Sequence, residues 1–255
     1  ESGVSEFLVS GNIHNGSSVV INTDGTVGIV TVLGSPNPII SNLGIFSPDT
    51  QNVSGVEYTV TLYDPVNQKI VVAYTDQSNQ NYGSACVGTV VGTAITFGTP
   101  VNFSGTSGVN GISGVYDPDS GKVIFAFETE SGTTGGYTIV GTVSGDSITF
   151  GSLNGPFTTD NIERTETTYD TTNNKVVICY RNVNENRGAV VVGTLSGTNM
   201  SFGTEVLLQT QSEDLSSTFD PDEEKVIINY RYSSSNYSVV GTVSGTSISF
   251  GSPVE

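Results

Sequence analysis

The sequence has few of the side chains from which catalytic and metal sites are usually built. It contains no tryptophan, one histidine and two cysteines among 255 residues. Serine–histidine–aspartate triads and cysteine–histidine pairs need a histidine base, and zinc sites need clustered histidine and cysteine. Cys86 and Cys179 lie in apolar, strand-like runs outside any CxxC pattern, so we expect buried core residues without a disulfide.

Glycoside hydrolysis needs only two carboxylates, which the chain could supply. However, the absence of tryptophan removes the aromatic platforms common at sugar-cleaving sites, and no Ser-x-Asp-x-Gly-x-x-Trp box occurs. The sequence therefore predicts a non-enzymatic protein without a metal or cofactor.

Basic residues are scarce. Lysine and arginine number 8 against 25 aspartates and glutamates, which gives a formal net charge of -17. A nucleic-acid binder needs a basic stripe, and an anionic membrane surface also attracts cations, so neither partner is expected. No apolar run is long enough for a membrane-spanning helix. Such an acidic surface suits a salty exterior, where screening weakens self-repulsion.

The sequence does contain four copies of one template, YDPxxxKVVIAY…VGTVSGTSISFG. An anchor aspartate marks each copy: Asp64, Asp117, Asp170 and Asp220. Each copy reads as four short strands rich in Val, Ile, Thr, Tyr and Phe, separated by turn residues. We name them A to D in chain order: A ends at the anchor aspartate, B is the KVVIAY-like run, C carries VGTV, and D is the ISFG segment. Four antiparallel strands in about 50 residues describe a β-propeller blade. The predicted fold is thus an all-β propeller, with blades at about 58–103, 104–157, 158–208 and 209–255.

Residues 1–57 depart from the template. They contain strand-like pieces at 6–9, 18–22, 26–32 and 38–46, with a hairpin signal whose turn is Asp24-Gly25. The region is either a divergent first blade, which makes five blades, or a β-cap on a four-bladed propeller.

Loop lengths distinguish the two ends of the blades. The spacing from anchor aspartate to strand-B lysine, and the spacing from VGT glycine to FG phenylalanine, are the same in every copy. The A–B and C–D turns are therefore constant, whereas the B–C and D–A loops vary. In a four-stranded meander these two sets lie at opposite ends. We expect the variable face to carry recognition, because loops on a rigid scaffold usually do.

The anchor aspartates fit a structural turn, since an aspartate before proline accepts hydrogen bonds from the next backbone N–H groups. The alternative is calcium binding, aided by Asp119, Asp222, Glu223 and Glu224. Because no Asp-x-Asp-x-Asp-Gly pattern occurs, the turn is preferred.

Candidate contact residues lie in or beside the B–C loops, where tyrosine and arginine supply contact area and donors for glycans or proteins. They are Tyr82, Tyr137, Arg181, Arg187, Arg231 and Tyr237. The residue after the strand-B aromatic is not the same in all four copies, which have Thr75, Glu128, Arg181 and Arg231 there. This divergence favours one irregular contact surface over several equal sites.

The template and the leader NGSSVVINTDGTV resemble tandem repeats of tail-fibre and other virion surface proteins of marine bacteriophages. The resemblance implies a place on the virion exterior, as fibre, appendage or capsid decoration. Implied partners are other virion proteins, host-surface glycans or proteins, and further copies of the chain. The alternative is a secreted, multivalent, lectin-like glycan-binding propeller.

Overall fold

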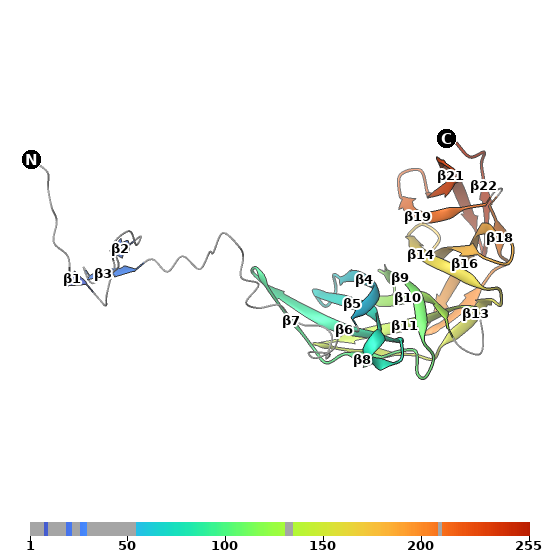
Figure 1. Ribbon diagram of the computed structural model, residues 1–255. Helices are drawn as coiled ribbons and strands as arrows, with labels where there is room; N and C mark the ends of the chain where they lie inside the picture. The colour runs from blue at the N-terminus through green and yellow to red at the C-terminus, as the bar shows by residue number, and fades with distance from the viewer. Residues whose placement is uncertain (1–7, 10–18, 22–25, 30–54, 131–134, 209–210) are drawn as a thin grey trace, which may run out of the picture. The chain divides into compact units, whose positions relative to one another are not determined.

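The computed structural model describes residues 8–9, 19–21, 26–29, 55–130, 135–208 and 211–255 (Figure 1). The chain divides into two compact units, Glu1–Leu43 and Gly44–Glu255. No helix within these described ranges is long and apolar enough to cross a membrane.

The first unit contains three short strands, β1 (Leu8–Val9), β2 (Val19–Ile21) and β3 (Thr26–Ile29). β2 pairs antiparallel with β3, which confirms the predicted hairpin, and β1 pairs parallel with β3. The turn Asp24-Gly25 and the predicted strand at 38–46 lie outside the described residues. The choice between a divergent blade and a cap stays a prediction.

The second unit contains four antiparallel sheets, one for each repeat, as the sequence predicts for propeller blades. We number them in chain order: sheet I contains β4 to β8, sheet II β9 to β13, sheet III β14 to β18, and sheet IV β19 to β22. The short 3-10 turn η1 (Gln77–Asn79) lies in the B–C loop of sheet I. The strands of sheets I and II are β4 (Val56–Asp64), β5 (Lys69–Asp76), β6 (Tyr82–Val91), β7 (Ala94–Phe97), β8 (Val101–Asn102), β9 (Val109–Asp117), β10 (Lys122–Thr129), β11 (Gly136–Ser144), β12 (Ser147–Phe150) and β13 (Asn154–Thr158). Those of sheets III and IV are β14 (Ile162–Asp170), β15 (Lys175–Asn182), β16 (Arg187–Ser196), β17 (Asn199–Phe202), β18 (Val206–Leu207), β19 (Glu213–Asp220), β20 (Lys225–Tyr232), β21 (Ser235–Ser244) and β22 (Ser247–Phe250).

The outer edge of each sheet is built from two pieces. In sheet I, β7 pairs with the second half of β6 and β8 pairs with its first half. β13 and β18 repeat this arrangement, and a single bridge from Val254 to Ser238 replaces it in sheet IV. The sequence predicted only the first piece, because the second piece has only 2 residues in β8 and β18 and 5 in β13, too few for an alternating pattern to show.

The anchor aspartates close the A–B turns, as predicted. Asp64 is fully buried, and its Oδ1 accepts hydrogen bonds from the backbone N–H groups of Val66 and Asn67, both at 3.0 Å. Asp117, Asp170 and Asp220 accept the equivalent pairs of N–H bonds. A carboxylate satisfied by backbone donors belongs to the turn, and those donors oppose a cation at the same oxygen.

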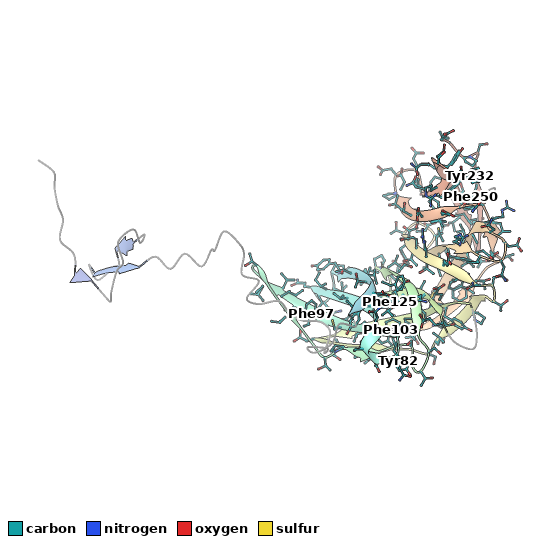
Figure 2. The ribbon with its side chains drawn as sticks, in the orientation of Figure 1. Tyr82, Phe97, Phe103, Phe125, Tyr232 and Phe250 are labelled. Atoms are coloured by element: carbon teal, nitrogen blue, oxygen red, sulfur yellow. The ribbon has the colours of Figure 1, made fainter. Side chains whose placement is uncertain are left out.

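The core lies between consecutive sheets. We call the face that meets the preceding sheet the incoming face, and the face that meets the next sheet the outgoing face. Between sheets I and II the outgoing face supplies small side chains such as Ala73 and Val87, and the incoming face supplies Phe125 and Phe127. Phe103 fills the same layer and stacks on Phe125 at 5.9 Å between ring centroids (Figure 2). Two further clusters repeat this pairing of small against large side chains.

Both cysteines are buried and free, as expected from their apolar surroundings. Burial raises the pKa of each thiol, Cys86 and Cys179, to about 12. The thiolate is therefore scarce at neutral pH, and both residues act as small core side chains.

Candidate binding site where the four inner strands begin

A β-bulge interrupts the first strand of every sheet near its start. In β4 the pairing with β5 shifts between Glu57 and Val60, and equivalent shifts occur in the other three sheets. At each bulge one residue, six before the anchor aspartate, adopts a left-handed backbone with φ between 48° and 56°. These residues are Tyr58, Gly111, Arg164 and Asp214. Only glycine adopts this conformation freely, so the other three carry backbone strain of about 1–3 kcal/mol each.

The four bulge residues line one cavity of about 360 Å³, which we call the axial cavity. The first strands of neighbouring sheets pack side by side, which brings the four equivalent positions together. The remaining lining residues are Ile112, Thr165, Glu166 and Leu215. Since each first strand begins where a D–A loop ends, the axial cavity opens on the variable face.

The floor of the axial cavity ties sheets II and III together. Thr165 is buried, and its hydroxyl donates to the backbone oxygen of Gly111. Ser113 in turn donates to the Thr165 hydroxyl at 3.0 Å. These buried, satisfied hydrogen bonds fix the bulge geometry at the base of the cavity.

Four ion pairs gather in sheets III and IV. Arg164 Nη1 pairs with Asp214 Oδ1 across the two sheets, and Arg231 Nε donates to Asp214 Oδ2 at 2.8 Å. Arg231 also pairs with Glu213. In sheet III, Arg181 Nη1 lies 2.7 Å from Glu163. The side chains of Arg164 and Asp214 are about half exposed, so a bound molecule can still reach them.

The opposite side is acidic and aromatic. The Tyr58 ring is 47% exposed. Its pKa is raised first by burial of the hydroxyl and then by four nearby carboxylates, those of Glu57, Glu128, Glu130 and Glu163. The axial cavity thus combines an accessible aromatic ring, carboxylates and guanidinium groups.

One of these carboxylates titrates near neutrality. Burial raises the pKa of Glu128 to about 7, and the charges of Glu163 and Glu130 add to the effect, while a hydrogen bond from Asn110 opposes it. Glu166, which unlike Glu128 lines the cavity, has its pKa raised by burial. The charge of the site therefore changes between mildly acidic and mildly alkaline pH.

The predicted contact residues are dispersed. Arg231 flanks the axial cavity through its ion pair with Asp214, whereas Arg181 pairs with Glu163, and neither of these two lines the cavity. Tyr82 and Arg187 lie half-buried at the starts of β6 and β16. Tyr137 is 9% exposed and belongs to the core between sheets I and II, so it has little surface to offer a partner.

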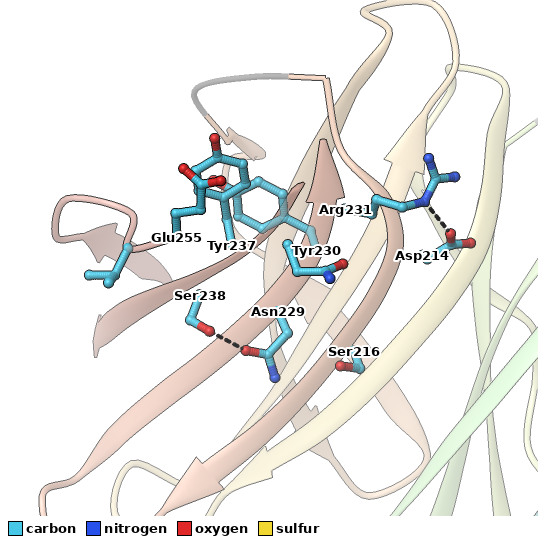
Figure 3. A pocket seen from close by; sticks show the side chains of 10 residues that line it. Asp214, Ser216, Asn229, Tyr230, Arg231, Tyr237, Ser238 and Glu255 are labelled. Carbon is cyan, nitrogen blue, oxygen red and sulfur yellow. Dashed lines mark hydrogen bonds and ion pairs between the residues drawn. The ribbon is translucent and has the colours of Figure 1, made fainter. Parts of the chain in front are cut away.

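Tyr237 stacks on Tyr230 with ring centroids 5.8 Å apart, on the incoming face of sheet IV, beside the core between sheets III and IV. It lines a second cavity, of about 420 Å³, away from the other predicted tyrosines. Asp214 lines both cavities, and in the second one it is paired with Arg231 (Figure 3).

The sequence alone did not predict that Tyr58, Arg164 and Asp214 lie together at one site. Their signal is a repeat position, six residues before the anchor, whose side chain changes from Tyr to Gly to Arg to Asp. Among the described residues no three or more His, Cys, Asp or Glu side chains come together as a metal site.

No protein-family model and no curated protein sequence matches the chain. Among solved structures, an exo-β-1,3-galactanase from Phanerochaete chrysosporium, solved with β-1,3-galactotriose, is similar with a TM-score of 0.51 at 8% identity, over 84% of this chain and 53% of that one. Two structures of an Aleuria aurantia lectin variant give TM-scores of 0.46 and 0.47 at 13% identity, each over 77% of this chain. One holds α-methyl-L-fucoside and the other Fucα1-6GlcNAc, and 59% and 60% of their length is covered.

The chain therefore spans between about half and three fifths of these solved chains. At 8% identity the likeness to the galactanase shows a shared all-β fold.

Proposed function

We propose that this chain is a non-enzymatic binding module that holds a saccharide in the axial cavity. The observation that carries the proposal is the convergence of one strained bulge residue from each sheet on a single cavity. The backbone there is repeated, but the side chains are Tyr, Gly, Arg and Asp. Four different side chains around one cavity favour the binding of one asymmetric ligand over four identical ones.

The chemistry of the cavity suits a sugar. An exposed aromatic ring such as that of Tyr58 can lie against the apolar face of a pyranose. Arg164 offers a guanidinium with five N–H donors, and Asp214 offers carboxylate oxygens, so hydroxyl groups find charge-assisted partners on the opposite wall. The galactanase of similar fold was solved with a galactose trisaccharide, which is compatible with this class of ligand.

A glycan array probed with the full chain identifies the sugar, and calorimetric titration then tests the site. Replacing Tyr58 by alanine removes the stacking surface, and we expect roughly tenfold weaker binding, about 1–1.5 kcal/mol. The matched control is Tyr63→Ala, because Tyr63 lies on the same strand, is 55% exposed and faces the constant end. Equal affinities for Tyr58→Ala and the unchanged chain would exclude the axial cavity.

The absence of turnover is tested on the same sugar. Glu163 is engaged by Arg181, and we expect no release of reducing ends when the chain is incubated with the array ligand. If reducing ends are released by the unchanged chain but not by Glu128→Gln, the chain hydrolyses the sugar and the proposal of a non-enzymatic module is wrong.

The place of the module, on a virion exterior, follows from the resemblance of the repeats and is part of the same proposal. In that setting the axial cavity would meet a host-surface glycan. Mass spectrometry of purified virions that finds no such chain would remove the virion setting while leaving saccharide binding open.

A further inference from the structure

The last facing pair of residues before each bulge differs in charge from sheet to sheet. In sheets III and IV a glutamate on the first strand faces an arginine on the second, as Glu163 faces Arg181 and Glu213 faces Arg231. The side chains of both pairs form ion pairs. Opposite charges at facing positions of a sheet stabilise it and cancel one another. In sheets III and IV the chain itself therefore neutralises the glutamate at this level.

Sheets I and II have a glutamate at the same level but no arginine. Glu57 on the first strand of sheet I faces Thr75. In sheet II the order is reversed, and Glu128 on the second strand faces Asn110. A threonine or an asparagine can donate a hydrogen bond, but neither carries the positive charge that would cancel a carboxylate. The glutamates of sheets I and II therefore stay uncompensated by their facing residues.

The sequence has no other lysine or arginine that could supply this charge. Between residues 1 and 157 the only ones are Lys69 and Lys122. Each begins the second strand of its sheet directly after the A–B turn, at the constant end. There Lys69 Nζ pairs with Asp146 at 2.7 Å, and Lys122 Nζ donates to the Thr142 hydroxyl at 3.0 Å. Both lysines thus lie at the end of the sheets opposite to the uncompensated glutamates.

Tyr58 marks where these glutamates meet the axial cavity. Its side chain lines the cavity and is 47% exposed. After burial, the causes that raise the pKa of its hydroxyl are the charges of Glu57, Glu128, Glu130 and Glu163, so these carboxylates lie around the ring. A cation against a tyrosine ring is attracted by the ring face, and nearby carboxylates add to that attraction.

The other side of the axial cavity leaves no free cation for an acidic ligand. Arg164 pairs with Asp214, and Asp214 also accepts a hydrogen bond from Arg231 (Figure 3). Glu166 lines the cavity, and the ion pairs of the described residues do not include it. A carboxylate or sulfate on the ligand would therefore be repelled, whereas a positive group would complement the site.

We propose that the saccharide in the axial cavity carries a protonated amine, which lies against Tyr58 on the side of sheets I and II. This inference rests on the proposed function and specifies its ligand as an amino sugar whose nitrogen is not acylated. The amine replaces the arginine that sheets III and IV supply and sheets I and II lack. The hydroxyl groups of the same sugar face Arg164 and Asp214.

Three β-1,4-linked disaccharides, of glucosamine, N-acetylglucosamine and glucose, separate charge from sugar shape because they differ only in the group on carbon 2. They are titrated calorimetrically into the full chain at about pH 6.5, below the pKa of an ordinary amino group. We expect the glucosamine disaccharide to bind roughly tenfold more tightly than the glucose disaccharide. This ratio should fall as salt is added, because salt screens exposed charges.

Two variants of equal charge change locate the effect. Glu57→Gln removes an exposed, uncompensated carboxylate, and we expect the ratio between the glucosamine and glucose disaccharides to fall toward one. Glu223→Gln, at an exposed position in the A–B turn of sheet IV, is the matched control and should keep the ratio of the unchanged chain. Tyr58→Ala should weaken all three disaccharides, because each loses the ring it lies against.

The outcomes separate this inference from the proposed function. Equal affinities for the glucosamine and glucose disaccharides, or a ratio that survives Glu57→Gln, would overturn the inference. An array on which the chain binds neutral or acidic sugars but no free amino sugar would do the same. In each of these cases saccharide binding still stands, provided that Tyr58→Ala weakens it. If the chain binds no sugar of any class, the proposed function fails and the inference fails with it.

Discussion

The interface glycines offer a test of the sheet packing that needs no ligand. Gly203→Ala and Gly251→Ala change the same motif, FG at the end of the last strand, in sheets III and IV. At Gly203 a Cβ atom would overlap the backbone carbonyl of Thr246, which belongs to the hairpin of the next sheet. A backbone atom cannot rotate away as a side chain can, so sheets III and IV must separate locally.

The size of the effect follows from overpacking. Forcing one methyl group into a closed interface costs about 1–3 kcal/mol. For a chain of this size, each kcal/mol lowers the melting temperature by about 2–4 °C. Gly203→Ala is thus expected to melt several degrees below the unchanged chain. Gly251→Ala, with open space around its Cβ, should melt within about 1 °C of it.

Thermal unfolding followed by circular dichroism, at a protein concentration where the chain is monomeric, measures both variants. The same loss of stability in Gly203→Ala and Gly251→Ala would mean that the glycine is required by the local backbone at the end of the last strand. In that case the contact between consecutive sheets would not be the reason for the glycine.

The remaining predictions concern single side chains. Because the pKa of Glu128 is about 7 in the folded chain, against about 4.3 when unfolded, stability should fall as pH rises from about 4 through 7. Glu128→Gln should flatten that dependence and, with allowance for solvent screening, stabilise the fold at pH 8 by about 1 kcal/mol in urea unfolding. An equally steep profile in the variant would assign the dependence to other groups. Glu224 has a φ of 57° in the A–B turn of sheet IV, so Glu224→Gly should raise stability by about 0.5 kcal/mol, while Gly121→Ala, at the equivalent turn position, should lower it by about 1 kcal/mol. Loss of stability in Glu224→Gly would show that the glutamate side chain supports the turn.

The sequence predicts those features of the fold that depend on repeated residues. The anchor aspartates, the constant turns and the four-stranded sheets all follow from residue types that recur at fixed spacing. Asp64, for example, is placed by its own backbone hydrogen bonds, which are local and readable from the YDP motif. Cys86 and Cys179 are likewise placed by the apolar runs around them.

The axial cavity could not be predicted from the repeated residues. It depends on bulges that turn one residue of each first strand into the left-handed region, and no local composition signals them: Tyr58, Arg164 and Asp214 are unlike one another. Only the packing of four distant strands brings these positions together. Tyr137 was predicted as a contact residue because it lies next to a variable loop in the sequence. Its side chain instead packs in the core between sheets I and II.

Saccharide binding in the axial cavity is tested most directly by locating the bound sugar. A crystal of the full chain soaked with the strongest sugar from the array should show difference density in the axial cavity, with a ring against Tyr58 and hydroxyl groups toward Arg164 and Asp214. Two results would contradict saccharide binding in the axial cavity. One is sugar density elsewhere, such as in the cavity beside Tyr237 on sheet IV, and the other is an empty axial cavity at saturating sugar.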